Sequence, residues 1–402
     1  MGLAPALHID GVVASGVTRP ASIEELCSTL REANAMRLRV TPVGGGTHSD
    51  VGYPVDRIDL AVDMTALSAV NEYEPDDLTI SVQAGMRVAA LASLLEARGQ
   101  HLPLDVEQPE RATIGGAIAV GHAGPRRYGF GSLRDLLIGL RVVLADGTLV
   151  KSGGMVVKNV SGYDLTKLHH GALGSLGLIV DANFKLLSAP KQRTLLIAEY
   201  RSPSIALEAA ASLVQGALPY SAVAVTGPGK VHVGCEGHIK DAARLRAEAL
   251  KVLQAAGAAE VQELHGTADS ASHWGSIGPA ARGEAEVVFR VNAPIAAMAG
   301  LTRQALELGV EHDLVMSWTA DMGCGVLELG AGPKVGIPRL NRFYEALAQI
   351  AELVRVSHGA PDVRRELPVF GPEPQGLALM RLIKNQFDPN GILNVGKNVG
   401  RL

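Results

Sequence analysis

The fold is decided by two glycine-dense stretches, PVGGGTH at residues 42–48 and RATIGGAIAVGHAGPRRYGFGSLRD at residues 111–135. Glycine has no Cβ and reaches positive φ. A loop such as GGGT at residues 44–47 can therefore turn its backbone N–H groups inward and let an anionic ligand approach the main chain. Together the two stretches predict a cradle for the pyrophosphate of a dinucleotide.

A nicotinamide-binding Rossmann site is the obvious alternative, but its spacing is missing. Such a site needs G-x-G-x-x-G between a strand and a helix, with an acidic residue about 20 positions later. After Gly46 the chain reads THSDVGYPVDRID, which is typical of a turn-rich loop rather than of a helix start. For the first stretch alone a second alternative stays open, because three adjacent glycines also make an ordinary flexible turn.

The stretch that follows decides between these alternatives. From Ile138 the chain joins a strand, an Asp146-Gly147 hairpin turn, a second strand, a glycine turn and a third strand with almost no spare residues. Its motifs are TIGG at residues 113–116, RD at 134–135, ADG at 145–147, KN at 158–159, GYDL at 162–165 and GSLG at 174–177. In this order they resemble the FAD-binding domain of the vanillyl-alcohol-oxidase flavoproteins, the PCMH type. The resemblance spans residues from about 12 to 190 and returns at FDPNGILNVGK, residues 387–397.

The resemblance implies FAD as the cofactor and nominates the residues that hold it. In the family the first glycine loop holds the pyrophosphate, the TIGG stretch and its loop line the ring and ribityl chain, and a C-terminal Asn-Pro-Gly turn closes over the flavin. Val395 replaces the proline of that turn and removes its rigid residue. The FAD-binding residues expected in this way are Pro42, Gly44, Gly45, Gly46, Thr47, His48, Pro103, Thr113, Ile114, Gly115, Gly116, Ala119, His122, Gly124, Asp164, Gly177, Ile179 and Asn394.

The attachment of the flavin is expected to be non-covalent. Some relatives bind FAD covalently through a histidine placed directly after the glycines, whereas Thr47 stands between Gly46 and His48 here. We therefore expect His48 to form a plain hydrogen bond, with covalent attachment as the alternative.

Composition sets the limits of the function. A chain of 402 residues with 47% hydrophobic side chains predicts an ordered protein of two or three domains. A net charge of −4 with scattered arginines argues against nucleic acid as a partner. The chain has no apolar run of eighteen residues and no signal-peptide pattern, so we expect no transmembrane segment and a cytoplasmic location.

Neither a disulfide framework nor a metal site is expected. The cysteines are Cys27, Cys235 and Cys324, which are far apart and form no C-x-x-C motif, so an iron–sulfur cluster has to come from another subunit. His169 and His170 are adjacent on a predicted helix, point about 100° apart and rarely share one ion. We interpret them as residues of the helix surface.

Local signals predict the elements around the first glycine loop. Ser22 and Glu25 have capping-box spacing before a helical run at residues 26–33, and a short strand at residues 38–40 then leads into the loop. Residues 88–98 predict a second helix, which Gly99 ends.

After residue 190 the pattern changes to β-α-β-β-α-β, and it occurs twice. The first unit has strands at residues 195–200, 222–225, 231–235 and 260–264, with helices at 204–214 and 239–255. The second has strands at residues 286–291, 313–318 and 326–329 and a weak last strand, with helices at 294–307 and 337–354. We expect the two units to join edge to edge into one sheet with its helices on one face. The fold class is thus α+β: an FAD-binding domain at residues 1–190, a cap at 191–369 and a C-terminal segment at 370–402 that returns to the FAD domain.

The catalytic candidates are His358 and Arg364. Oxidation of a hydroxy acid by a flavin needs a group that accepts the hydroxyl proton and a cation that holds the carboxylate. His358 is followed by Arg364 and Arg365 near the end of the cap, where the chain returns towards the flavin. The plain alternative is a surface histidine in a glycine turn beside a solvated arginine pair.

Within its family the chain resembles the FAD-binding E-type subunits of bacterial glycolate oxidase. This implies oxidation of a small 2-hydroxy acid, glycolate, to glyoxylate, with electrons passed to a D-type flavin subunit and an F-type iron–sulfur subunit that hold the chain near the inner membrane. D-type subunits carry a Glu-His-Gly motif late in the chain, where Ser357, His358 and Gly359 stand here. Two alternatives remain: a self-sufficient flavin oxidase or dehydrogenase of another hydroxy substrate, and a non-catalytic assembly subunit.

Overall fold

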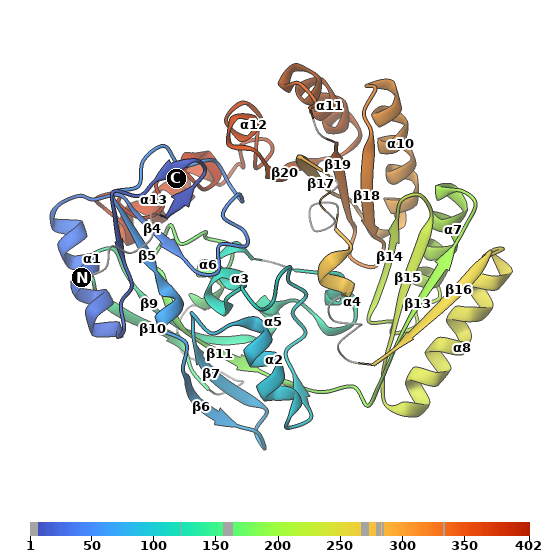
Figure 1. Ribbon diagram of the computed structural model, residues 1–402, viewed down its shortest axis with the longest axis horizontal. Coiled ribbons are helices and arrows are strands. Elements are labelled where there is room, and N and C mark those ends of the chain that lie inside the picture. The colour runs from blue at the N-terminus through green and yellow to red at the C-terminus, as the bar shows by residue number, and fades with distance from the viewer. Residues whose placement is uncertain are drawn as a thin grey trace.

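The computed structural model describes residues 7–121, 123–155, 164–266, 273–278, 283, 285–332 and 334–402. The motif residues His122, Lys158, Asn159, Gly162 and Tyr163 lie outside this part of the chain. Figure 1 shows two bodies side by side, with the last segment of the chain returning to the N-terminal body.

The first helix begins where the sequence predicts it. Ser22 caps α1 (Ile23–Ala35), because its hydroxyl accepts a hydrogen bond from the Glu25 N–H at 3.1 Å. The Glu25 carboxylate accepts a second bond from the Ala21 N–H at 2.7 Å. With Leu26 fully buried, the helix packs one face into the core.

Two further layers of strands build the rest of the N-terminal body. Its other elements are β1 (His8–Ile9), β2 (Val12–Val13), β3 (Gly16–Thr18), β4 (Val40–Val43), β5 (Leu60–Asp63), η1 (Met64–Ala66), β6 (Val70–Glu74), β7 (Thr79–Gln83), α2 (Val88–Glu96), β8 (Gln100–His101), α3 (Ile114–Val120), α4 (Arg127–Phe130), α5 (Leu133–Leu136), β9 (Leu137–Val143), β10 (Leu149–Gly153), α6 (Thr166–His169), β11 (Leu178–Lys185) and β12 (Leu187–Ser188). A parallel sheet has the order β3-β5-β4, and an antiparallel sheet has the order β10-β9-β11-β7-β6. Since β4 ends at the first glycine loop, that loop lies at the carboxyl end of a parallel strand, where α/β sheets bind ligands.

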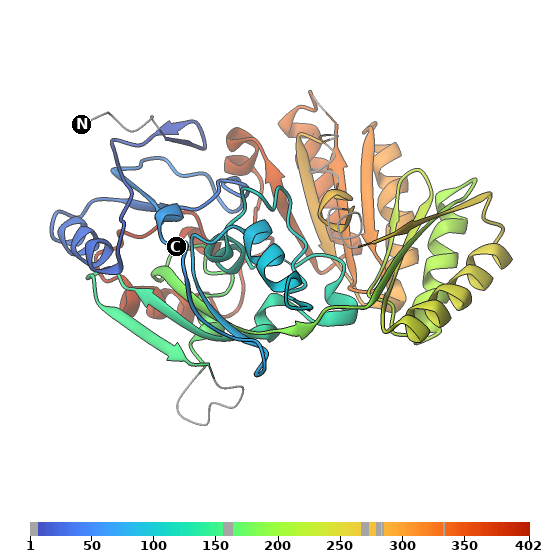
Figure 2. The same ribbon diagram turned by 60° about the horizontal axis from the view of Figure 1, so that its bottom comes forward.

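The second body is the predicted pair of β-α-β-β-α-β units. Its elements are β13 (Gln192–Glu199), α7 (Pro203–Gln215), β14 (Ala222–Thr226), β15 (Lys230–Gly237), α8 (Ile239–Ala255), β16 (Glu260–His265), β17 (Val287–Asn292), η2 (Ile295–Ala297), α10 (Met298–Glu311), β18 (Met316–Asp321), β19 (Val326–Ala331), α11 (Ile337–Ile350) and β20 (Leu353–Gly359). They form one eight-stranded sheet in the order β16-β13-β15-β14-β18-β19-β17-β20. The units join through β14 and β18, and Figure 2 shows α7, α8 and α10 on the face turned away from the N-terminal body. The predicted α+β fold with its double cap unit is confirmed.

One predicted boundary is wrong. The helix expected to reach Val354 ends at Ile350, and β20 already begins at Leu353. Val354 and Val356 are buried against α11, and their backbones pair with β17. The segment alternates buried and exposed residues, so it forms a strand and does not continue the helix.

The C-terminal segment returns through α12 (Pro361–Glu366), α13 (Leu377–Phe387) and η3 (Val399–Arg401). The Val40 N–H donates to the Ile392 carbonyl at 2.8 Å, and Val40 accepts from the Asn394 N–H at 2.8 Å. These bonds add the segment to the edge of β4 as a parallel bridge. They bring Asn394 beside the first glycine loop, although the two are at opposite ends of the sequence.

A buried chain of charges joins the two bodies. In the N-terminal body Asp105 accepts from the Arg126 side chain at 2.6 Å, and Arg126 lies 3.8 Å from Glu236 of β15. Glu236 also pairs with Arg193 of β13 at 3.3 Å, and its side chain is fully buried. Burial lowers the pKa of Arg126, but Asp105 and Glu236 outweigh it and raise that pKa above its ordinary value. The charges are thus paired across the boundary between the bodies.

Candidate functional site

A pocket opens at the end of β4, between the first glycine loop, α3 and the C-terminal segment. It holds about 1040 Å³ of empty space, open solvent at its mouth included. The predicted residues that line it are Pro42, Gly44, Gly45, Gly46, Thr47, His48, Thr113, Gly115, Gly116, Ala119, Gly177, Ile179 and Asn394. Segments from three distant parts of the sequence therefore converge on one cavity.

The glycine loop presents free hydrogen-bond donors to this pocket. Among the described residues, the backbone N–H groups of Gly44, Gly45, Gly46 and Thr47 have no acceptor. Several adjacent N–H groups that line a concavity form a typical phosphate-binding arrangement. The loop thus has the donors that a pyrophosphate requires.

Close packing explains why the loop has glycine. A Cβ on Gly44 would overlap the Thr113 hydroxyl, and one on Gly45 would overlap the Arg111 carbonyl. Gly46 has φ +70°, which favours glycine directly. The loop lies against residues 111–113 with no room for side chains, which answers the flexible-turn alternative.

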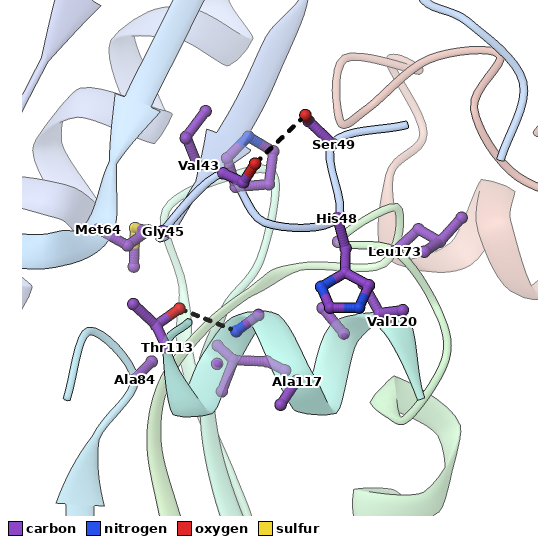
Figure 3. Close-up of a pocket in the computed structure, with 18 of the residues that line it drawn as sticks. Val43, Gly45, His48, Ser49, Met64, Ala84, Thr113, Ala117, Val120 and Leu173 are labelled. Carbon is purple, nitrogen blue, oxygen red and sulfur yellow. Dashed lines mark hydrogen bonds between the residues drawn. The ribbon is translucent and has the colours of Figure 1, made fainter. Parts of the chain in front are cut away.

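The opposite wall is apolar and is shown in Figure 3. Thr113 caps α3 by accepting from the Gly116 N–H at 3.3 Å, and the helix presents Ala117 and Val120 to the cavity. Met64 and Ala84 extend the same surface. A flat aromatic ring system fits such a wall through its apolar faces.

A buried polar atom on the C-terminal side is positioned to bind a ligand. The Asn394 Nδ2 group donates to the Leu173 carbonyl at 2.5 Å, while its Oδ1 atom is buried and has no partner among the described residues. Buried acceptors rarely stay unpaired, so a hydroxyl or amide of a bound molecule is the natural donor. Lys397 lines the pocket beside it and donates to the Ser49 carbonyl at 2.6 Å. The free donors, the apolar wall and this acceptor fit FAD.

Other predicted residues lie elsewhere. Pro103 is buried outside the lining, Ile114 points into the core below α3, and Gly124 lines a second, neighbouring pocket. The Asp164 carboxylate accepts from the Thr166 N–H at 3.2 Å, and His122 is outside the described residues. Pro103, Ile114, Gly124 and Asp164 are thus not among the described residues that line the first pocket.

The interpretation of His169 as a surface residue is wrong. Its side chain is only 4% exposed and packs edge-on against Phe387 at 5.8 Å. Burial lowers the pKa of His169 to about 4, so the imidazole is neutral.

His358 lies on β20 and forms an ion pair with Asp50, which follows the first glycine loop. The Asp50 carboxylate raises the pKa of His358 above its ordinary value, against the opposing effect of burial. Burial also raises the pKa of Asp50, but His358 and Arg364 outweigh it and hold that pKa below its ordinary value. His48 on the pocket wall is close enough that Asp50 opposes the lowering of its pKa by burial. The pair thus connects the cap to the rim of the pocket.

Arg364 differs from its predicted catalytic role. Its side chain is 1% exposed. Nε donates to the Gly359 carbonyl at 2.7 Å, Nη1 donates to the Gly52 carbonyl at 2.8 Å, and Nη2 pairs with Asp10. Every nitrogen of the guanidinium already has a protein acceptor. Arg364 therefore holds the cap strand to the N-terminal segment rather than a substrate.

Two functional candidates escaped the sequence analysis. Asp50 stands four positions after Gly46, but nothing in the sequence pairs it with His358, because only the fold brings β20 to this loop. Lys397 lies in the C-terminal stretch that resembles the family, and that position was the available signal.

Comparisons with known proteins agree with this geometry. Residues 14–153 match the family described as FAD binding domain, and residues 370–398 match FAD linked oxidases, C-terminal domain. These two segments are thus similar to FAD-linked oxidases, and they support the resemblance to the PCMH-type flavoproteins. FAD is therefore confirmed as its cofactor, and so is the prediction of an FAD-dependent oxidoreductase.

The relatives differ in how much of this flavoprotein they cover. Glycolate oxidase subunit GlcD of Bacillus subtilis (strain 168) is 24% identical over 95% of this chain and 88% of that protein. Glycolate oxidase subunit GlcE of Escherichia coli (strain K12) is 36% identical, but over only 37% of this chain and 42% of that protein. The solved structure of an alkyldihydroxyacetonephosphate synthase superposes on this chain with a TM-score of 0.70 and 16% sequence identity. The match covers 94% of this chain and 75% of that chain. The last comparison supports the fold alone.

No helix among the described residues has both the length and the apolarity needed to cross a bilayer.

Proposed function

We propose that this flavoprotein oxidises a small 2-hydroxy acid, glycolate in the first instance, within a glycolate oxidase. The observation that carries the proposal is the His358–Asp50 pair, because Asp50 directly follows Ser49, which lines the pocket that fits FAD. The similarity to two glycolate oxidase subunits supports the substrate class.

The roles of the chain's own residues follow from the geometry. Nδ1 of His358 faces the Asp50 carboxylate, so the proton sits on Nδ1 and Nε2 is left as the acceptor for the substrate hydroxyl proton. Asp50 orients the imidazole and stabilises the imidazolium that forms. FAD, when bound, would supply the acceptor for the hydride equivalent that leaves the substrate carbon. The donors of residues 44–47, the α3 wall and Asn394 would hold it non-covalently.

The proposal includes a division of the chain into two domains. Residues 1–190 and 370–402 form the FAD domain and residues 191–369 form the cap. The bridge of Val40 with Leu393 and the eight-stranded sheet between Gln192 and Gly359 support this division.

The chain is proposed to act as the FAD-binding E-type subunit, with a D-type flavin subunit and an F-type iron–sulfur subunit that take the electrons. No set of cluster-binding cysteines occurs in the sequence, which supports an external relay. Self-sufficient catalysis is the second candidate, and it is favoured by the similarity to D-2-hydroxyglutarate dehydrogenase of Stutzerimonas stutzeri (strain A1501), 24% identical over 90% of that protein.

A steady-state assay tests the function and separates the two candidates. Glycolate, D-lactate and D-2-hydroxyglutarate are offered to the full chain with FAD and a dye acceptor, first alone and then with the D-type and F-type subunits. Turnover by the chain alone supports self-sufficiency, and turnover only in the mixture, lost in His358→Gln, supports the subunit role. Turnover of none of the acids in either setting, or turnover unaffected by His358→Gln, contradicts the proposal.

A further inference from the structure

Two arginines lie directly opposite each other on the cap sheet. Arg290 of β17 pairs in register with Arg355 of β20 on one side and with Glu328 of β19 on the other. Their strand neighbours Phe289 and Val356 are buried under the helices, so the three charged residues share the opposite face. Like charges facing each other across strands are destabilising, which calls for a reason to keep them.

That face is turned towards the FAD domain. Arg290 and Glu328 line the second pocket together with Asp105 and Glu107 of the N-terminal body. The pocket holds about 530 Å³ of empty space, open solvent included. Arg290 is thus at the boundary between cap and FAD domain, and Arg355 beside it is exposed to solvent at the edge of this boundary.

A β-bulge brings His358 to the same face. Residues three apart on a regular strand point to opposite faces, so Arg355 and His358 would be separated by the sheet. The register of β20 shifts between the partners Val288 and Phe289, so His358 pairs with Val288 while Arg355 pairs with Arg290. The extra residue, Ser357, places His358 on the same face as Arg355. Neighbouring side chains on one face of a strand are about 7 Å apart.

The two arginines differ in what they already bind. Arg290 Nη1 donates to the Glu328 carboxylate at 3.1 Å. Within the described part of the chain, Arg355 has no acceptor for its side chain. With one carboxylate for two guanidinium groups, the trio keeps one positive charge in excess, and that charge lies beside the proposed base.

We infer that Arg355, assisted by Arg290, binds the carboxylate of a small 2-hydroxy monocarboxylic acid. The inference deepens the proposed function and rests on it. An arginine presents planar donors that match a carboxylate, and the neighbouring His358 then faces the hydroxyl on the adjacent carbon. A second carboxylate on the substrate is disfavoured, because Glu107 and Glu328 line the pocket that Arg290 borders.

Binding of oxamate, a non-reacting monocarboxylate, tests the site through the perturbed absorption of the FAD-loaded full chain. Arg355→Met should weaken oxamate binding about 10- to 100-fold, and Arg355→Lys should restore part of it. Binding of glycolamide, which lacks the charge, should stay unchanged. Arg342→Met, on the exposed face of α11, is the matched control and should leave both affinities unchanged.

Each outcome decides. Oxamate binding that is absent in the wild type, equal in Arg355→Met, or lost together with glycolamide binding overturns the inference. If glycolate never reduces the flavin while oxamate binding still depends on Arg355, the proposed function fails and the carboxylate site stands. If glycolate turnover is lost in His358→Gln but the KM for glycolate is unchanged in Arg355→Met, the proposed function stands and the carboxylate site fails.

Discussion

At the scale of single residues, the glycine loop depends on missing side chains. Gly45 lies against the Arg111 carbonyl, and backbone cannot move aside as a flexible side chain can. The Arg111 guanidinium in turn donates to the Gly45 carbonyl at 3.2 Å, which fixes the distance between the two segments.

Gly45→Ala should therefore displace the loop and lower the FAD content of the purified chain severalfold, with a loss of about 1–3 kcal/mol in unfolding free energy. Released FAD per chain and denaturant unfolding measure the two effects. Gly300→Ala is the control: a Cβ there meets nothing within 4 Å on α10, so FAD content should not change. Full FAD content in Gly45→Ala would contradict the assignment of the loop.

The pH dependence of catalysis belongs to the His358–Asp50 pair. Asp50 raises the pKa of His358 above 6.5, and a base must be neutral, so kcat/KM should fall as pH drops through that raised pKa. In Asp50→Asn the raising carboxylate is gone while burial still lowers the pKa of His358. The acidic limb should then move to lower pH while kcat decreases, because the imidazole loses its orientation.

The pH profile of kcat/KM in both forms is the measurement. Asp56→Asn, at an exposed carboxylate near the same loop, should leave the profile unchanged. An acidic limb that stays in place in Asp50→Asn would show that another group titrates.

At the scale of elements, sequence patterns predicted most of the cap and little of the site. Short apolar runs mark β13, β14 and β15 locally. The second unit repeats the order of strands and helices, and this repeat predicted the joined sheet. The bulge in β20 left no such signal, because a single extra residue changes the face of His358 without changing the composition of the strand.

Arg364 failed as a catalytic prediction for a related reason. The sequence shows only that Arg364 stands near a histidine. The burial of Arg364 depends on its contacts with Asp10 and Gly52, which are distant in the chain. The same holds for Lys384 of α13, which is buried and donates to the carbonyls of Ser175 and Leu393 at 2.8 and 2.9 Å. Non-local partners decide the role of such residues.

Lys384→Met should cost about 3 kcal/mol of unfolding free energy, because the buried Asp388 carboxylate loses its cation. Since Lys384 also holds the Leu393 carbonyl next to Asn394, FAD affinity should decrease too. Denaturant unfolding and FAD titration are the measurements. Lys251→Met removes a solvent-exposed cation paired with Glu248 and should change neither quantity measurably. Unchanged stability in Lys384→Met would contradict the anchoring role of α13.

At the scale of the whole molecule, the proposed function depends on how the eight-stranded sheet is placed against the N-terminal body. Two sets of buried ion pairs hold the sheet so that β20 reaches the loop after the glycines. One joins Asp105, Arg126, Glu236 and Arg193, and the other joins Arg364 to Asp10. His358 comes from one body and Asp50 from the other, so neither body contains the proposed base complete.

The central claim is that a small 2-hydroxy acid reduces the flavin of this chain with His358 as the base. The most direct measurement is the visible spectrum of the FAD-loaded full chain under anaerobic conditions, alone and with the D-type and F-type subunits, before and after addition of glycolate. The account predicts that the flavin bands bleach in at least one of these settings and that His358→Gln slows the bleaching about 100-fold or more. Bands that persist in every setting, or that bleach as fast in His358→Gln, would contradict it.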